Sequence, residues 1–180
     1  MKRTETPLPG VLLLEPRLFR DARGHFLETW NRKAFEEAGI RADFVQDNAS
    51  RSLRRVLRGL HYQVRKSQGK LVTCLRGEIF DVAVDLRRGS PAFGRGFGCR
   101  LAGDRPSALW IPPGFAHGFL VLSEEADVHY KVTEFYSPAD ERGIAWNDPA
   151  LGIEWPLDGG APILNERDAA FPPLSRAELP

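Results

Sequence analysis

The chain has 180 residues, and its 25 Lys and Arg side chains against 24 Asp and Glu side chains give a formal net charge of +1. This balance provides no long-range positive field of the kind that nucleic-acid-binding proteins use, so we expect no nucleic-acid partner. Two cysteines, Cys74 and Cys99, are too few for a disulfide framework and lack metal-ligand spacing. We therefore expect reduced thiols and a cytoplasmic protein.

The N-terminal residues 1–7 contain no apolar stretch like that of a secretory signal. No apolar run in the chain approaches the ~18 residues that a membrane span needs, so we expect no membrane partner. A chain of this length fits one domain with a sizeable core, and we predict a single domain over residues 1–180.

Many short apolar runs, separated by 17 glycines and 14 prolines, give the sequence the rhythm of an all-β protein. The strands predicted in chain order are residues 11–14, 25–30, 44–47, 56–63, 70–75, 78–86, 96–101, 108–111, 118–122 and 128–135. Residues 78–86 give the clearest pattern, because Val82 and Val84 alternate with Asp81 and Asp85. We expect the polar face of this strand to point into a cavity.

Only residues 31–39 indicate a helix, with Asn31 suited to the N-cap and Gly39 suited to a left-handed stop. About ten short strands in one domain must form a sandwich or close into a barrel, since an open sheet of that width leaves its edges exposed. The sequence therefore predicts an all-β fold, a double-sheet jelly roll with a few short helices.

The stretch Leu-Arg-Gly-Leu-His-Tyr-Gln at residues 57–63 places a titratable base close to the later Lys70. An imidazole such as that of His61, with an ordinary pKa of about 6.5, accepts a proton at neutral pH and returns it. A lysine ammonium in a dry cavity stabilises a developing oxyanion. The combination is typical of carbanion chemistry, although His61 as a core histidine and Lys70 as a solvated strand end remain an alternative.

Arg58 and His61 would point to opposite faces of a regular strand, because side chains alternate along it. Gly59 lies between them, and a glycine inside a strand often marks a bulge. We predict a bulge here that brings both side chains to one cavity.

Residues 112–119, Pro-Pro-Gly-Phe-Ala-His-Gly-Phe, resemble the second conserved box of the cupin family. Many cupins bind a metal through that histidine, here His117, together with a His-x-His pair on an earlier strand. Gln63 stands where the second histidine of the pair would be, and His25 and His129 lie in unrelated segments. We therefore predict a cupin-type jelly roll with no metal ligands.

Further motifs extend the resemblance along nearly the whole chain. They are Arg23 and Gly24 with Phe26 and Glu28, then residues 44–48, 57–63, 69–72, 81–85, 113–119, 130–131, 136–138, 146–149 and 164–168. In this order they resemble the dTDP-4-dehydrorhamnose 3,5-epimerase family of the cupin superfamily.

The resemblance implies an isomerase that inverts C3 and C5 of a dTDP-4-keto-6-deoxyhexose without a cofactor, in the biosynthesis of dTDP-L-rhamnose or a related deoxysugar. His61 would be the base, and Asp168 would hydrogen-bond its other ring nitrogen. Lys70 would hold the enolate oxygen. Tyr130 would deliver the new proton to the opposite face of the sugar ring.

The family pattern also implies a set of substrate-binding side chains that meet the diphosphate, the nucleotide or the sugar. They are Arg23, Arg58, Phe19, Phe26, Glu28, Gln46, Asn48, His117, Phe135 and Arg167. Members of the family form homodimers in which an N-terminal strand crosses to the partner sheet, so we expect the same here. The chain departs from the family pattern at Ala49, His129 and Phe135.

Three other functions remain open from the sequence. Relatives in antibiotic-sugar pathways invert only C3 or only C5 and keep much the same motifs. A metal-dependent cupin enzyme is disfavoured by Gln63. A non-catalytic sugar-nucleotide sensor would keep Arg23 and Arg58. It would have no need of the whole catalytic set, His61, Lys70, Tyr130 and Asp168.

Overall fold

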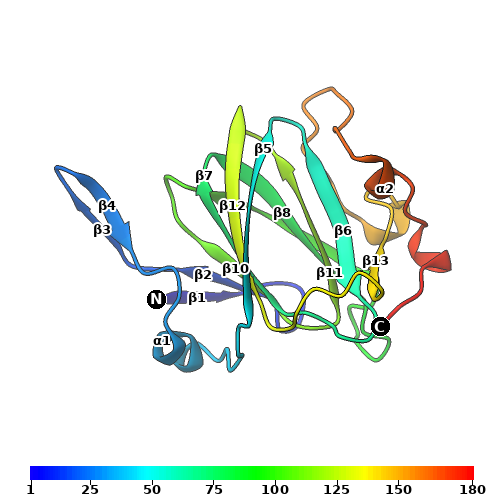
Figure 1. Cartoon of the computed structure of the whole chain (residues 1–180), viewed down its shortest axis with the longest axis horizontal. Coiled ribbons are helices and arrows are strands. Elements are labelled where there is room, and N and C mark those ends of the chain that lie inside the picture. The colour runs from blue at the N-terminus through cyan, green and yellow to red at the C-terminus, as the bar shows by residue number, and fades with distance from the viewer.

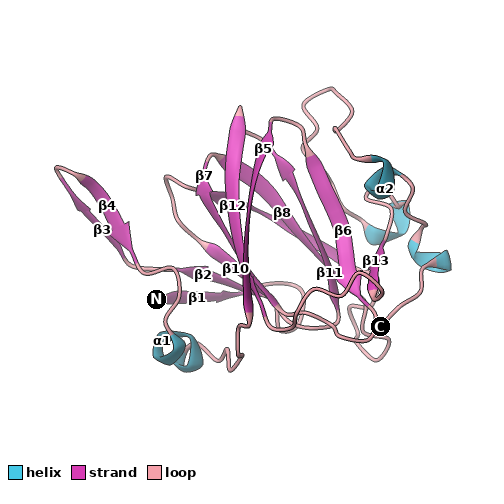
Figure 2. Ribbon diagram, in the orientation of Figure 1, coloured by secondary structure: helices cyan, strands magenta, loops and turns pink.

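The computed structural model describes residues 1–180 as two antiparallel sheets and a separate hairpin (Figures 1 and 2). The larger sheet has the order β1 (Lys2–Glu5), β2 (Leu12–Glu15), β10 (Ala108–Ile111), β7 (Lys70–Arg76), β12 (Glu125–Val132) and β5 (Gln46–Leu53). The smaller sheet has the order β13 (Glu141–Gly143), β6 (Leu57–Gln63), β11 (Phe115–Val121), β8 (Glu78–Asp85) and β9 (Gly96–Ala102). The predicted all-β, double-sheet architecture is confirmed.

The main core lies between the two sheets, where Val72 and Leu109 of the larger sheet pack with Ile79 and Ala83 of the smaller one. The outer face of the smaller sheet is covered by C-terminal residues such as Leu151. Strand β8 shows the predicted alternation: Val82 and Val84 pack on that outer face, while Asp81 and Ala83 point between the sheets. Helix α1 and the residues after it pack on part of the outer face of the larger sheet, against β2, β10 and β7.

Helix α1 (Arg32–Glu37) begins as predicted, because the side chain of Asn31 accepts a hydrogen bond of 3.1 Å from the backbone N–H of Ala34. Gly39, just beyond its end, has a φ of +89°. The other helical segments are α2 (Glu166–Ala169) and two 3₁₀ turns, η1 (Pro149–Leu151) and η2 (Leu174–Arg176). None of these helices is long and apolar enough to span a membrane.

Some strand predictions were wrong in extent. Strand β5 runs over Gln46–Leu53 rather than over residues 44–47, because its alternate side chains are polar on both faces and give no apolar period. Strand β1 was missed because all four of its residues are exposed. The strand predicted at residues 25–30 is shorter, since β4 (Gly24–Leu27) ends at the turn before α1 and pairs with the unpredicted β3 (Leu18–Asp21).

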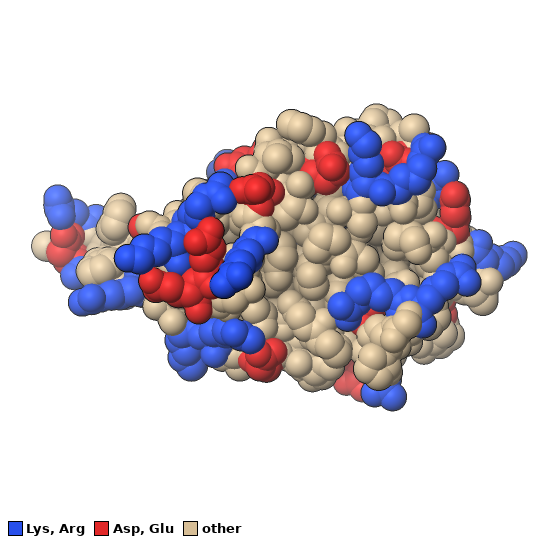
Figure 3. Space-filling view, turned by 90° about the horizontal axis from the view of Figure 1, so that it is seen from below, with Lys and Arg blue, Asp and Glu red and all other residues tan.

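The β3–β4 hairpin projects away from the two sheets and pairs with no strand of either (Figure 1). Its strands are almost fully exposed. On the face seen in Figure 3, Lys and Arg side chains lie next to Asp and Glu side chains at this end of the molecule. This mixture agrees with the small net charge of the chain.

Candidate active site

A cavity of about 270 Å³ opens between the sheets, with strands of both sheets and helix α2 supplying its polar side chains. Its lining consists of Ser50, Arg58, His61, Lys70, His117, Phe119, Tyr130, Tyr136, Glu141 and Arg167. Six of the predicted site residues are therefore brought together: Arg58, His61, Lys70, His117, Tyr130 and Arg167. Asp168 lies directly behind one of them.

The Nε2 atom of His61 lies 2.8 Å from Oδ1 of Asp168, whose side chain is 1% exposed. The other carboxylate oxygen accepts a hydrogen bond of 2.9 Å from the backbone N–H of Gly59. Burial alone would raise the pKa of Asp168, but the hydrogen bonds from His61 and Gly59 outweigh it and lower that pKa. Because the ionised carboxylate accepts the Nε2 proton, Nδ1 of His61 keeps a free lone pair.

Helix α2 holds Asp168 in place from the other side. The side chain of Asn165 caps the helix by accepting a hydrogen bond of 2.7 Å from the backbone N–H of Asp168. The ring of Phe171, which follows the helix, meets the ring of His61 edge to face at a centroid distance of 5.5 Å. Together these contacts fix the orientation of the imidazole.

The predicted bulge at Gly59 is confirmed. His61 pairs with His117, but Arg58 pairs with Phe119, so β6 contains one more residue than β11 between the two pairs. Gly59 has a φ of +126°, and a Cβ atom there would lie 2.6 Å from the Cα atom of Gly118. Only glycine fits at this point. The bulge is what allows Arg58 and His61 to line the same cavity.

Lys70 is 8% exposed, and its ammonium lies 3.5 Å from the backbone oxygen of His61. Burial lowers the pKa of Lys70 to about 8, although the negative charges of Glu141 and Asp81 act in the opposite direction. Only this one long hydrogen bond engages the ammonium, which leaves donors for an anionic group in the cavity.

Tyr130 enters the cavity from β12 of the larger sheet, whereas His61 enters from β6 of the smaller one. Burial raises the pKa of Tyr130, so its hydroxyl is protonated at neutral pH. The ring of His117 lies 6.5 Å from that of Tyr130 between centroids. His117 is fixed through Nε2, which is 2.8 Å from Oδ1 of the fully buried Asp81.

The sequence did not identify four of the lining residues as site residues: Ser50, Phe119, Tyr136 and Glu141. Ser50 shares one face of β5 with Gln46 and Asn48, but the sequence expectation ended the strand at residue 47 and so gave no reason to group Ser50 with them. Glu141 gave none, because it lies on the three-residue strand β13 after a loop. Its carboxylate accepts hydrogen bonds from the Tyr136 hydroxyl at 2.8 Å and from the guanidinium of Arg167.

Seven predicted binding residues do not line this cavity. Gln46 and Asn48 lie beside it on β5, where their side chains hydrogen-bond each other at 2.8 Å, and Phe135 is 60% exposed in the adjoining loop. The other four, Phe19, Arg23, Phe26 and Glu28, lie on or next to the projecting β3–β4 hairpin. The guanidinium of Arg23 forms an exposed ion pair of 2.5 Å with Asp21 of the same hairpin.

The side chains form no group of three or more His, Cys, Asp and Glu residues that could hold a metal ion. Gln63, at the place of a possible cupin ligand, donates instead to the backbone oxygen of Lys66 at 2.7 Å. Its amide oxygen accepts the backbone N–H of Ser137 at 2.8 Å. The side chain of Gln63 thus ties β6 to the loop that carries Tyr136.

Comparisons with known proteins agree with the motifs. The family model described as dTDP-4-dehydrorhamnose 3,5-epimerase matches residues 5–176. The dTDP-4-dehydrorhamnose 3,5-epimerase of Pseudomonas aeruginosa is 59% identical over 169 residues, which are 93% of each chain. The dTDP-6-deoxy-D-glucose-3,5-epimerase of Legionella pneumophila, solved in complex with dTDP-4-keto-L-rhamnose, is 48% identical, with a TM-score of 0.96 over 99% of this chain and 97% of the other.

A more distant solved structure is ChmJ, a 3'-monoepimerase from Streptomyces bikiniensis in complex with dTDP-quinovose. It is 35% identical, with a TM-score of 0.88 over 94% of this chain and 86% of the other. The fold is therefore shared by proteins described as inverting two centres and by one described as inverting a single centre.

Proposed function

We propose that this chain, which belongs to the dTDP-4-dehydrorhamnose 3,5-epimerase family, inverts C3 and C5 of a dTDP-4-keto-6-deoxyhexose without a cofactor. The observation that carries the proposal is one cavity in which the His61–Asp168 pair faces Tyr130 and lies beside Lys70. This set provides a base, an acid and a cation for an oxyanion, which is all that the inversion of an acidic carbon centre requires.

The reaction begins when Nδ1 of His61 takes the proton from a carbon next to the 4-keto group. The electron pair of the C–H bond delocalises onto O4, and the resulting enolate oxygen is stabilised by the ammonium of Lys70. Asp168 stabilises the imidazolium of His61, because its carboxylate stays ionised and hydrogen-bonded to Nε2. The same events at the second carbon complete the double inversion.

Tyr130 donates the new proton from the opposite side. Its position on β12, in the sheet facing the one that carries His61, supports this role. After donation the phenolate recovers a proton from solvent, and His61 releases the one it took, so that the reaction consumes nothing. Arg58, His117 and Arg167 bind the substrate at the walls of the cavity.

The protein acts as a homodimer with exchanged N-terminal elements, and the β3–β4 hairpin of each chain completes the site of the other. The exposure of Phe19 and Phe26, which are 47% and 69% exposed, supports this arrangement, as does the absence of Arg23 from the lining of the cavity in its own chain. In the dimer these residues meet the nucleotide and the diphosphate of the partner's substrate.

Each chain forms one domain over residues 1–180 in the cytoplasm, where its two free cysteines stay reduced.

Complementation between two impaired variants, assayed at a substrate concentration well below the KM of Arg23→Ala, tests the exchange. Arg23→Ala chains lack the hairpin cation, and His61→Ala chains lack the base. When the two variants are refolded together, a mixed dimer contains one site with both residues intact, and activity returns to a fraction of the wild-type value. If mixed dimers form but no activity returns, Arg23 acts within its own chain.

Incubation with dTDP-4-keto-6-deoxyglucose in deuterated water tests the activity itself. The expected result is deuterium at both C3 and C5, read by NMR, with no added metal or cofactor. Label at C3 alone would identify a single-centre epimerase. Absence of label at both carbons would refute the proposal.

A further inference from the structure

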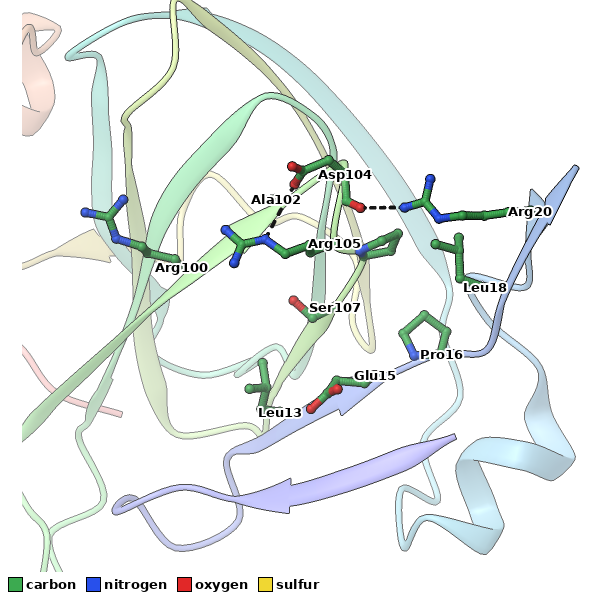
Figure 4. Close-up of a pocket in the computed structure, with 11 residues that line it drawn as sticks. Leu13, Glu15, Pro16, Leu18, Arg20, Arg100, Ala102, Asp104, Arg105 and Ser107 are labelled. Atoms are coloured by element: carbon green, nitrogen blue, oxygen red, sulfur yellow. Dashed lines mark hydrogen bonds and ion pairs between the residues drawn. The ribbon is translucent and has the colours of Figure 1, made fainter. Parts of the chain in front are cut away.

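The β3–β4 hairpin has very few attachments to the rest of the chain. Beyond the pairing of its own two strands, its foot is held by a hydrogen bond of 3.2 Å from the side chain of Asn31 to Glu28. Only Arg20 reaches the body of the molecule: its Nη2 donates to the backbone oxygen of Asp104 at 2.9 Å, across 84 residues of sequence (Figure 4). Within its own chain, few contacts therefore set the direction in which the hairpin projects.

Open space lies on both sides of the hairpin. A cavity of about 510 Å³ separates its base, at Leu18 and Arg20, from the turn after β9. Another of about 380 Å³ lies between Phe19 and Phe26 on one side and Phe35 of helix α1 on the other. Neither cavity is filled by a packed core, so apolar burial against its own chain does not fix the direction of the hairpin.

The acceptor of the Arg20 hydrogen bond is fixed much more firmly than the donor. Asp104 lies in a tight turn that is closed by a bridge between Ala102 and Arg105. The turn is pinned to the sheet by the hydrogen bond of 3.0 Å from the N–H of Gly103 to the oxygen of Gly77. A Cβ atom on Gly103 would lie 2.6 Å from the oxygen of Leu75, so the turn fits closely against β7.

Arg20 differs from the other two arginines around the same cavity. The guanidinium of Arg100 pairs with Glu78 at 3.0 Å, and that of Arg105 lies 3.8 Å from the carboxylate of Asp104. Arg20 has no carboxylate partner, and its hydrogen bond ends on a backbone carbonyl. A carbonyl of a rigid turn offers a fixed direction, whereas an exposed flexible carboxylate does not.

We propose that Arg20 is a positioning residue that sets the direction of the hairpin and so delivers Arg23 and Phe26 to the partner's site. This inference rests on the proposed function, because it takes the hairpin as the element that completes the second site. Arg20 itself touches no substrate. Its loss leaves the residues of the cavity in place and widens the range of positions that the hairpin visits.

The experiment compares four variants of the full chain by kinetics. Arg20→Met keeps the aliphatic stem and removes the donor, and it is expected to raise KM about 3- to 10-fold while kcat stays within about twofold. Arg20→Lys keeps a donor and is expected to restore part of the loss. Asp104→Ala removes a carboxylate but keeps the accepting carbonyl, and Arg105→Met removes a neighbouring guanidinium, so both are expected to match the wild type.

A second measurement follows the hairpin without relying on activity. Spin labels at Ala22→Cys and Glu37→Cys, in chains diluted with unlabelled protein, report the distance between the hairpin tip and helix α1. We expect a wider distance distribution in Arg20→Met than in Asp104→Ala. An unchanged distribution, or an Asp104→Ala variant as impaired as Arg20→Met, would refute the role of Arg20. If the wild type introduces no deuterium into the sugar, the proposed function fails. The spin-label distances still show whether Arg20 positions the hairpin.

Discussion

The His61–Asp168 pair and the β3–β4 hairpin are held in the molecule in opposite ways. Asp168 is buried and fixed from three sides, by His61, by the backbone of Gly59 and by the cap of helix α2. The hairpin is exposed and reaches the body of the molecule through one hydrogen bond from Arg20. The proton-transfer groups are thus complete within one chain, whereas four of the predicted substrate-binding residues are placed away from them.

The difference follows from what each part must do. Proton transfer tolerates an error of only about 0.5 Å, so its groups need rigid support from packed strands. Binding of a flexible nucleotide can be shared with a second chain, because charge and aromatic contact are less demanding in distance. Changes at the His61–Asp168 pair should therefore act on the rate of chemistry, and changes on the hairpin should act on affinity.

The largest effect is expected for His61→Ala. Since one imidazole serves both carbons, deuterium exchange at C3 and at C5 should fall together, by at least about 10⁴-fold, the upper end for general base catalysis. The binding of dTDP, measured by calorimetry, should be nearly unchanged. His129→Ala is the matched control, because this histidine lies on the same sheet as Tyr130 but near Asp47, with Nε2 3.7 Å from its carboxylate. Exchange that survives at one carbon would reveal a second base.

The next effect concerns Lys70, where activity and stability should move in opposite directions. Lys70→Met removes the donor for the enolate oxygen, and kcat should fall by about 10²- to 10³-fold. Burial of the ammonium is costly, as the lowered pKa of about 8 indicates, so the same variant should raise the free energy of unfolding by about 1 to 3 kcal/mol at pH 7. Urea denaturation measures this gain, and a loss of stability would contradict it.

The pH dependence of that gain has a defined sign. Because the pKa of Lys70 is lower in the folded state, the unfolded chain binds more protons between about pH 8 and the ordinary lysine value. The stability of the wild type relative to Lys70→Met should therefore rise through this window, and the advantage of the variant should shrink. The kcat/KM of the wild type should fall above about pH 8, as the ammonium of the free enzyme loses its proton.

The sequence could predict the chemistry far better than the shape of the site. His61, Lys70 and Tyr130 lie on strands with clear apolar periodicity. Gly59 indicated the bulge that brings Arg58 to the same cavity. Strand β5 was mostly missed, because a strand with polar residues on both faces has no period to detect. Glu141 was missed because its position depends on a three-residue strand after a loop.

The sequence did not predict that the hairpin projects away from the sheets, for a different reason. The two strands within residues 18–27 are short, exposed and mixed in polarity. Their pattern therefore does not distinguish strands that join a sheet of their own chain from strands that project away from it. Family motifs named Arg23 and Phe26 as site residues without stating which chain they serve. Their distance from the cavity becomes visible only in three dimensions.

On the hairpin, Arg23→Ala should act on affinity alone. The loss of one charge-assisted contact to a diphosphate corresponds to about a 10- to 100-fold rise in KM, with kcat within about twofold of the wild type. Arg32→Ala is a suitable control, since that exposed arginine pairs with Asp43 in the same way but lies on helix α1. A fall in kcat as large as that of Lys70→Met would show that the hairpin takes part in chemistry and would end the contrast between the two regions.

The smallest effect should have the opposite sign. Asp21 competes with the substrate for Arg23, because its carboxylate accepts from the guanidinium at 2.5 Å and would repel a diphosphate that approaches the same turn. Exposed pairs of this kind are weak, so Asp21→Asn should lower KM by at most about fivefold. Asparagine is the right replacement, since its side-chain oxygen can still accept the backbone N–H of Arg23, which Asp21 now accepts at 2.8 Å. The gain should shrink as salt concentration rises, because screening weakens both the pair and the repulsion. Asp43→Asn, in the segment after helix α1, should change nothing. An Asp21→Asn variant with raised KM would mean that the ion pair orients Arg23 rather than competing with the substrate for it.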